Sequence, residues 1–312
     1  MVSLTGSAAA HSSPDPRAPR WVRSRTADTV MSMEHLRWSA RPVLDEPVLI
    51  AAFEGWNDAG EAATTAIRFL KDRWHHEDFA TIDPEDFYDF TTTRPLVTID
   101  DESVREVVWP GNVFSAVTHP ERSLDLIVLD GVEPQLRWRT YCDQVIDIAR
   151  AYGVRLVLTL GALLADVAHT RPVSVFGTAY DDQVIEALDL EPSRYEGPTG
   201  IVGVLHSACR AADINSASLW AAVPTYVSGA PSPKGALALV ERTTQMLDLP
   251  VSTTELTIAA TSYERQVSEL VADDEDTLAY VRRLEEQYDR NEHSVGSADD
   301  LVEEVERFLR DQ

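Results

Sequence analysis

Continuous apolar runs alternate along this chain with segments in which apolar residues recur at helical spacing. The first strong run, residues 48–53 (VLIAAF), is followed over residues 59–70 by Ala, Ile and Leu at the three- and four-residue intervals of an amphipathic helix. Further apolar runs occupy residues 124–131, 154–161, 173–179 and 218–224. Because these runs are apolar throughout, we expect a mostly parallel or mixed sheet covered by helices on both faces, which is the α/β class.

Weaker patterns add three elements to this α/β region. Residues 87–90 (FYDF) are predicted to form a strand, and residues 96–99 (LVTI) and 104–109 (VREVVW) to pair as a hairpin around an Asp-Asp turn. A long helix is predicted from Gln135 to Tyr152, because the glycine that follows is a common helix end.

Composition divides the chain into three regions. Residues 1–40 are expected to be a disordered tail, because they are rich in Ser, Ala, Pro and Arg and have no apolar period. Residues 41–250 carry the α/β core pattern. Residues 251–312 are predicted to form a helical extension, with an acidic junction at 272–276 (ADDED) and a last helix that Ser297 would cap.

Charge and hydropathy exclude several classes of protein. The chain has 27 Lys plus Arg against 52 Asp plus Glu, and its formal charge of −25 repels nucleic acid and anionic membrane surfaces. No apolar run approaches the roughly 18 residues that a membrane span requires. We therefore expect a soluble cytoplasmic protein without nucleic-acid or membrane partners.

The turn after the first strong run, FEGWNDAG (53–60), has glycines at the separation found in phosphate-binding loops. Such a loop needs a Lys and then a hydroxyl after the second glycine, but Glu61 and Ala62 stand there. A carboxylate in the first helical turn would also repel a phosphate. We interpret the stretch as a strand, a turn and a helix capped by Asn57 or Asp58.

A second glycine-rich stretch, YEGPTGIVG (195–203), contains no Lys or Arg. Without a cation it is a poor anion site, so its glycines are interpreted as positions of close packing. Thr199 is placed to cap the helix that follows. No GxGxxG follows an apolar run and no GxSxG is present, so neither a dinucleotide site nor a hydrolase elbow is predicted.

The cysteines and the paired histidines give no metal site. Cys142 and Cys209 are far apart, without CxxC spacing, and are expected to be buried on helices. His75 and His76 are adjacent, so on a helix they would point to different faces. No metal and no cofactor is predicted.

Acid/base chemistry has a small set of candidates, which are Glu54, Asp58, Asp130, His169 and Glu196. Ligands of open α/β sheets bind beyond the carboxyl ends of strands, where the first three of these residues fall. Glu54, Asp58, Asp130 and Glu133 could converge there, and two nearby carboxylates can split their pKa values or share a magnesium ion. Carboxylates in these positions also cap helices and end strands, and we favour that interpretation. A histidine just before a strand can act as a general acid or base.

A set of longer stretches recurs in order between residues 43 and 250. They are FEGWNDAGEAA (53–63), DPEDFYDF (83–90), LDGVEPQLRWR (129–139), LGALLADVAHTRPV (160–173), YEGPTGIVGVL (195–205), SLWAAVPTYV (218–227) and PSPKGALAL (231–239). Together they resemble the bacterial branch, found in actinobacteria, of the proteasome assembly chaperone family.

The resemblance implies a three-layer α/β sandwich akin to nucleoside phosphorylases and hydrolases, assembled as a homo-oligomer. It implies a role in proteasome assembly or a related protein-binding task, and no catalytic residue. Archaeal relatives engage the proteasome core through a carboxyl-terminal tripeptide of a hydrophobic residue, Tyr and any residue. This chain ends in Arg310, Asp311 and Gln312, so that docking mode is not expected here.

Two classes of function follow. The first is an oligomeric assembly-chaperone-like protein that binds itself and proteasome core subunits. Its interface candidates are Trp109, Trp138 with the flanking Arg137 and Arg139, and Tyr226. The second is an enzyme on a phosphorylase-like scaffold that acts on a small polar substrate through the acid/base candidates above. We favour the first class, because the sequence contains no convincing catalytic constellation.

Overall fold

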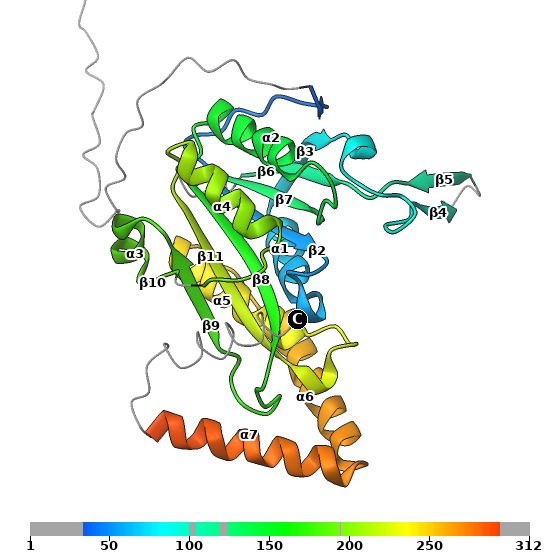
Figure 1. The fold of residues 1–312 in the computed structure, drawn as a ribbon, viewed down its shortest axis with the longest axis vertical. Helices are drawn as coiled ribbons and strands as arrows, with labels where there is room; N and C mark the ends of the chain where they lie inside the picture. Colours follow the sequence, from blue (N-terminus) through cyan, green and yellow to red (C-terminus); the bar gives the residue numbers. More distant parts are fainter. Residues whose placement is uncertain (1–33, 100–103, 119–123, 194, 294–312) are drawn as a thin grey trace, which may run out of the picture.

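A computed structural model describes residues 34–99, 104–118, 124–193 and 195–293 of the chain. Its central element is a nine-stranded sheet with the strand order β1-β3-β6-β7-β2-β8-β11-β9-β10 (Figure 1). Helices cover this sheet on both faces, and two further helices extend beyond it at the C-terminal end of the described chain. The α/β class and the helical extension are thereby confirmed.

The middle of the sheet consists of parallel strands. They are β7 (Leu126–Val132), β2 (Val48–Glu54), β8 (Leu156–Ala165) and β11 (Ser216–Pro224). Each pairs in parallel with the next in this order. All the residues from Val48 to Phe53 are buried, which is the expected result of packing a strand between two helical layers. The apolar runs of the sequence therefore mark these strands correctly.

Antiparallel pairing widens the sheet on either side of this centre. The outer strands on the β7 side are β6 (Asn112–Thr118), β3 (His75–Ile82) and β1 (Leu36–Trp38), and those on the β11 side are β9 (Val175–Ala179) and β10 (Glu191–Pro192). β9 runs antiparallel to β11, and β10 pairs in parallel with β9. The sheet is consequently mixed.

Two expectations change at the β1–β3 edge. His75 and His76 lie on the strand β3, where both are exposed, and not on a helix. Leu36 is buried and pairs with Ile82, so this part of the segment 1–40 belongs to the sheet. The apolar side chain supplies the reason, because its burial in the core offsets the entropy of ordering a short edge strand.

The helices form two layers, one on each face of the sheet. One layer contains α1 (Ala62–Asp72), α3 (Asp182–Leu188) and α5 (Pro233–Leu247), and the other contains α2 (Trp138–Ala151) and α4 (Ile201–Ala211). Alternate residues of β2 feed the two cores, with Ile50 in the first and Leu49 in the second. The result is the three-layer sandwich that the resemblance implied (Figure 1).

The residues 87–90 do not form the predicted strand. Asp83 accepts a hydrogen bond from the backbone N–H of Glu85 and starts a short 3₁₀ helix, η2 (Pro84–Asp86). Phe87 then closes this turn on the carbonyl of Pro84 and packs edge-on against Tyr141 of α2. Phe87 is thus buried under a helix. Its aromatic neighbours in the sequence gave the stretch the composition of a strand, which explains the wrong prediction.

The predicted buried cysteines are confirmed. Cys142 lies on α2 and Cys209 on α4, and burial raises the pKa of both thiols to about 12. Thiols of this kind are inert hydrophobic side chains at neutral pH.

The C-terminal region of the described chain consists of α6 (Thr254–Ala272) and α7 (Glu275–His293). They share an apolar cluster to which Tyr263 and Val267 of α6 and Val281 of α7 contribute. The acidic stretch 272–276 contains the junction, where Asp274 accepts a hydrogen bond from the backbone N–H of Thr277. The last predicted helix, after Ser297, lies outside the described residues.

A buried polar pair joins α4 to the sheet. The Nε2 atom of His206 lies 2.9 Å from the hydroxyl oxygen of Thr159 on β8, and the histidine is only 5% exposed. Burial lowers the pKa of His206 to about 4, so the imidazole is neutral at neutral pH. In the unfolded chain a histidine has a pKa of about 6.5.

This difference predicts a pH dependence of stability. Between pH 6.5 and 4 the unfolded chain binds a proton at His206 that the folded chain does not, so the free energy of unfolding falls as the pH is lowered through this window. At pH 5 the loss relative to pH 8 amounts to about 2 kcal/mol. Urea unfolding of the natural protein and of His206→Phe at pH 8 and 5 measures it. The variant should show a smaller pH slope by about that amount, and equal slopes would contradict the assignment.

Candidate functional site

The carboxylates at the ends of β2 and β7 meet on a shared arginine. Arg68 of α1 donates from Nη2 to Glu54 and from Nε to Asp130, the latter at 2.9 Å. Burial by itself lowers the pKa of the guanidinium, but the hydrogen bonds to Asp130 and Glu54 outweigh it and the pKa of Arg68 is raised. Glu54 and Asp130 are therefore brought together as an ion-pair cluster, with the arginine in the place that a cation would take.

Asp58 caps the helical segment that starts at the turn after β2. Its carboxylate accepts hydrogen bonds from the backbone N–H groups of Ala63 at 2.7 Å and Thr64 at 3.3 Å, and from the Thr64 hydroxyl. Burial is the largest influence on its pKa and raises it, although these hydrogen bonds act in the opposite direction. Asp58 thus satisfies N–H groups in the first turn of α1, as predicted for a capping residue, although Glu61 occupies the N-cap position of that helix.

The start of α4 is held by a carboxylate from another part of the chain. Glu133, just after β7, accepts from the backbone N–H of Ile201 at 2.8 Å and from the side-chain amide of Asn57 at 3.0 Å. Gly200 is the N-cap residue, and a Cβ atom there would lie 2.6 Å from Asn57 and from Glu133. Thr199 was expected to cap this helix but does not, because the carboxylate already occupies the N–H of Ile201.

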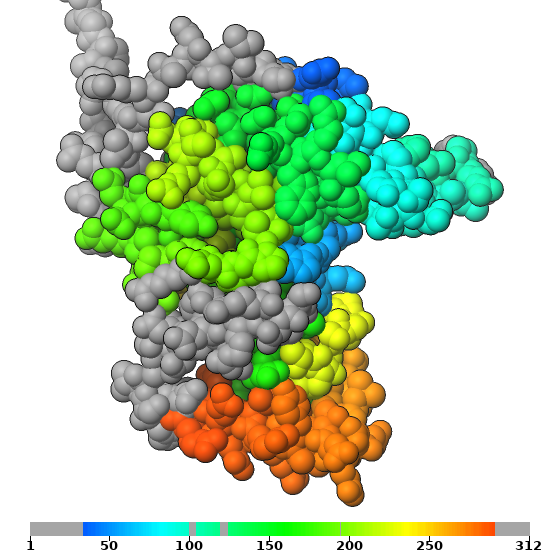
Figure 2. All heavy atoms as spheres, viewed as in Figure 1, coloured from blue at the N-terminus to red at the C-terminus, as the bar shows by residue number. Residues whose placement is uncertain are grey.

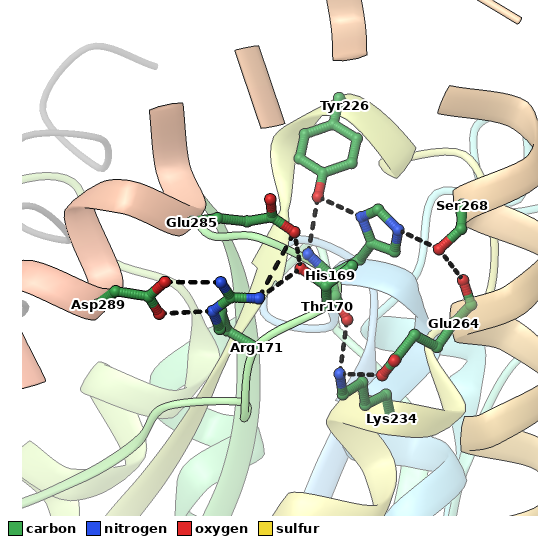
Figure 3. A network of polar contacts seen from close by, with 9 residues as sticks. All are labelled: His169, Thr170, Arg171, Tyr226, Lys234, Glu264, Ser268, Glu285 and Asp289. Carbon is green, nitrogen blue, oxygen red and sulfur yellow. Dashed lines mark hydrogen bonds and ion pairs between the residues drawn. The ribbon is translucent and has the colours of Figure 1, made fainter. Parts of the chain in front are cut away.

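His169 lies in a polar network between the core and the C-terminal helices (Figure 3). Ser268 of α6 donates its hydroxyl proton to the carbonyl of Glu264, so it accepts the Nε2–H of His169 at 3.0 Å. The other ring nitrogen, Nδ1, then accepts the hydroxyl proton of Tyr226 at 2.8 Å. Burial and the nearby Lys234 lower the pKa of His169, in keeping with this neutral tautomer.

The residues after His169 hold α7 in the same network. Arg171 makes a two-pronged ion pair with Asp289, with both N···O distances at 2.7 Å, and Thr170 donates to Glu285. Lys234 of α5 donates to the carbonyl of His169 and to Glu264 of α6. The polar groups of this network are engaged with one another, which is the pattern of a structural junction.

The remaining acid/base candidate, Glu196, is exposed on the loop before α4. The candidates thus occupy an arginine cluster, a helix cap, a helix junction and an exposed loop. No group of three or more His, Cys, Asp and Glu within the described ranges is arranged to hold a metal ion.

A cavity of about 110 Å³ opens beside α4, over β8, β9 and β11. None of the acid/base candidates lines it. Its lining residues are Trp56, Asn57, Leu163, Phe176, Thr178, Ala179, Tyr180, Ser193, Tyr195, Pro198, Thr199, Gly200, Val202, Gly203, His206, Ser218 and Trp220. The two glycine-rich stretches, 53–60 and 195–203, contribute to this lining, but no cavity was predicted from them, because the remaining residues come from separate segments that only the fold brings together.

The predicted hairpin is confirmed and projects from the body of the molecule (Figures 1 and 2). It consists of β4 (Leu96–Ile99) and β5 (Arg105–Val108), which form a two-stranded sheet of their own. We call residues 96–99 and 104–109 the arm. Its large apolar side chains are between 47% and 70% exposed.

Both faces of the arm carry exposed apolar residues, together with Glu106 on one face and Arg105 on the other. Leu96 pairs with Val108 and the neighbouring Val97 pairs with Val107, and successive residues of a strand point to opposite faces. A two-stranded hairpin alone in water is marginally stable at best. The adjacent apolar residues LV and VVW in the sequence were the available signal, because in a hairpin with one solvated face they would alternate with polar residues.

The interface candidates have different surroundings. Trp109 lies at the base of the arm, is 51% exposed and contacts the ring of Phe90 at 4.7 Å between centroids. Trp138 is half-buried and donates its indole N–H to the carbonyl of Pro134, while Arg137 pairs with Asp86 at 2.8 Å and Arg139 is exposed.

Tyr226, by contrast, is engaged inside the chain. Its hydroxyl accepts the backbone N–H of His169 at 2.7 Å, and its ring meets Tyr280 of α7 edge-on. Of the aromatic candidates, Trp109 is the one that belongs to the arm.

Similarity to other proteins agrees with this architecture. Residues 52–271 match the PAC2 family. The chain is similar to a PAC2 family protein from Streptomyces avermitilis, with 46% identity and a TM-score of 0.71, and to a proteasome-assembly chaperone homologue from Mycobacterium tuberculosis, with 43% identity and a TM-score of 0.68. Each similarity covers 75% of this chain and 99% of the other.

PbaA from Pyrococcus furiosus, an archaeal homolog of proteasome-assembly chaperone, shares the fold at 17% identity and a TM-score of 0.55, over 81% of this chain and 99% of PbaA. No curated protein matches the chain significantly. None of the helices in the described ranges is long and apolar enough to cross a bilayer. The family match and the two actinobacterial neighbours, which agree with the resemblance found in the sequence, place this chain in the PAC2 family.

Proposed function

We propose that this protein is an oligomeric, assembly-chaperone-like protein of the cytoplasm, whose copies associate through the arm and whose clients are proteasome core subunits. Family membership and the chaperone homologue among its close neighbours support the chaperone-like class. The arm is the observation that carries the proposal, because it offers a protein-binding surface that needs no catalytic residue.

The physical argument starts from the exposure of the arm. Contiguous exposed apolar surface on a protein usually marks a contact with another molecule. Here the surface lies on a ribbon of two strands that has no third strand and no helix against it among the described residues. Packing on a partner would remove this apolar area from water and would also stabilise the ribbon itself.

A second copy of the chain fits this surface better than a transient client. The ribbon needs a partner throughout the life of the protein, and identical copies are present from synthesis onward. The contact would be apolar, so the charge of −25 on each copy opposes it only through screened repulsion over a distance. Closed symmetric assemblies are the commonest form of such self-association.

Substitution of one arm residue tests the self-association. Val107→Asp places a carboxylate in the proposed contact, and a desolvated unpaired charge there should weaken association at least about 100-fold. Val43→Asp is the matched control, because Val43 is 96% exposed and lies outside the arm. Size-exclusion chromatography with light scattering should give an oligomer for the natural protein and the control, and a monomer for the arm variant. An unchanged mass for Val107→Asp would refute the proposed contact.

The client is tested separately with purified proteins. The tagged protein is mixed with proteasome α-subunits, with β-subunits, or with both, taken from the organism that encodes this chain. We expect the tagged protein to retain these subunits in an affinity pull-down. Trp138→Asp is expected to reduce this retention, since a large aromatic ring beside the exposed Arg139 is a typical anchor. Circular dichroism checks that the variant is folded. Failure of every subunit combination to bind would remove the proteasome from the proposal and leave the self-association test unaffected.

Within the described ranges, no arrangement of side chains favours the alternative enzymatic function. Glu54 and Asp130 are both paired with Arg68, Asp58 accepts hydrogen bonds from the first turn of α1, and His169 is held between Tyr226 and Ser268. A general acid or base must be able to reach a substrate, and these groups already have protein partners.

A further inference from the structure

The cavity beside α4 has a fixed aromatic floor. The ring of Trp220 on β11 lies over Gly161 of β8, where a Cβ atom would approach the ring to 2.5 Å. The indole N–H donates to the hydroxyl of Ser218 at 3.1 Å, and that hydroxyl lies 2.9 Å from the hydroxyl of Thr178. The absence of a side chain at Gly161 therefore lets the ring lie against the sheet, and two hydroxyl groups fix its orientation.

Further aromatic side chains surround this floor. Phe176 on β9 and Tyr195 on the loop before α4 line the cavity. Trp56 and Tyr180 also line it and remain 42% and 49% exposed, respectively. Half-exposed aromatic rings that line the same open cavity as an aromatic floor can stack on a flat molecule.

Among the residues that the structure describes, the cavity is lined by hydrogen-bonding groups and by no charged side chain. None of the described residues that line it is Asp, Glu, Lys or Arg, although 25% of the residues in the chain are charged. An ion that entered would lose its hydration without gaining a counter-charge, which is strongly unfavourable. This composition selects uncharged ligands.

His206 is the polar lining residue with a ring nitrogen that can still form a hydrogen bond to a ligand. It is 95% buried, since only 5% of its surface is exposed, and it lines the cavity. Its Nε2 atom pairs with Thr159, whereas Nδ1 has no hydrogen-bond partner among the residues that the structure describes. Nδ1 is not among the fully buried side-chain atoms that lack a partner, so it is accessible to a ligand or a water molecule in the cavity.

The volume limits the ligand to about one ring. An apolar cavity of about 150 Å³ is sufficient for benzene in another protein, and this cavity, at about 110 Å³, is of similar size and is open at one side. A ring could thus enter while its substituents stay at the mouth between Trp56 and Tyr180.

We propose that this cavity is a binding site for an uncharged, planar aromatic ring that bears a hydrogen-bonding group on its edge. The ring stacks between Trp220 and the rings at the mouth, and its polar edge meets His206. This site does not depend on the arm or on the proposed clients, so its test is independent of theirs.

Benzamide is a suitable probe, because it is flat, uncharged and carries a carboxamide. Benzoate has the same shape with a negative charge, and cyclohexanecarboxamide has the same polar group without the flat ring. Each probe is titrated into the full-length protein, and the indole N–H resonances in NMR spectra give its affinity. The Trp220→Phe variant identifies the Trp220 signal. Benzamide should shift the Trp220 resonance and bind at least about tenfold more tightly than either analogue.

A matched pair of variants locates the binding. Trp56→Ala removes a half-exposed ring at the mouth and should weaken benzamide binding at least about fivefold, since stacking on an aromatic side chain contributes roughly that much or more. Ile258→Ala shortens an apolar side chain of α6 that is 66% exposed and lies outside the cavity, so it should have no effect. His206→Phe should weaken binding of benzamide but not of toluene, which has no polar edge.

The outcomes are decisive in both directions. Saturable binding with this order of probes and variants supports the site. Absence of a Trp220 shift, equal affinity for benzoate, or equal effects of Trp56→Ala and Ile258→Ala would overturn it.

Discussion

The contact between Glu133 and the first turn of α4 is the constraint on which the surrounding structure depends. One carboxylate joins the loop after β2, through Asn57, to the loop after β7 and to the backbone of Ile201. A Cβ atom at position 200 would push the Asn57 and Glu133 side chains out of this contact, which a glycine there leaves undisturbed. Because α4 is fixed at this point, its residue His206 lies against Thr159, and the space beside the helix stays open as a cavity. A carboxylate at a helix N-terminus is also the favourable partner for the helix dipole.

The sequence predicted the centre of the sheet better than its edges, for a physical reason. β2 and the strands next to it are buried on both faces, so their apolar runs are continuous and easily recognised. In β3, by contrast, the first four residues are exposed, and the polar sequence HHED resembles a loop or helix. The stretch 87–90 misled in the opposite way, because aromatic residues buried beneath a helix have the composition of a strand.

Local chemistry was predictable and long-range chemistry was not. Asp58 caps a helix a few residues further on, so the sequence alone contains both partners. Glu133 and Ile201 are 68 residues apart, and Arg171 and Asp289 are 118 apart, so neither pairing can be inferred without the fold. The cavity is the extreme case, since its lining runs from Trp56 to Trp220. The reason for a glycine at position 161 is apparent only from the fold, which places the Trp220 ring of the neighbouring strand against it.

The position of the arm in the chain has a consequence for how this architecture can change over evolution. The arm is inserted between β3 and β6, which are antiparallel neighbours with Ile82 opposite Asn112. The rings of Phe90 and Trp109 meet at its base, so the chain departs and returns at nearly the same place. An insertion of this kind is modular, since its length and sequence can diverge without altering the strand order of the scaffold. Substitutions and length changes confined to the arm can therefore change which partners the protein binds, while the α/β sandwich is conserved between lineages.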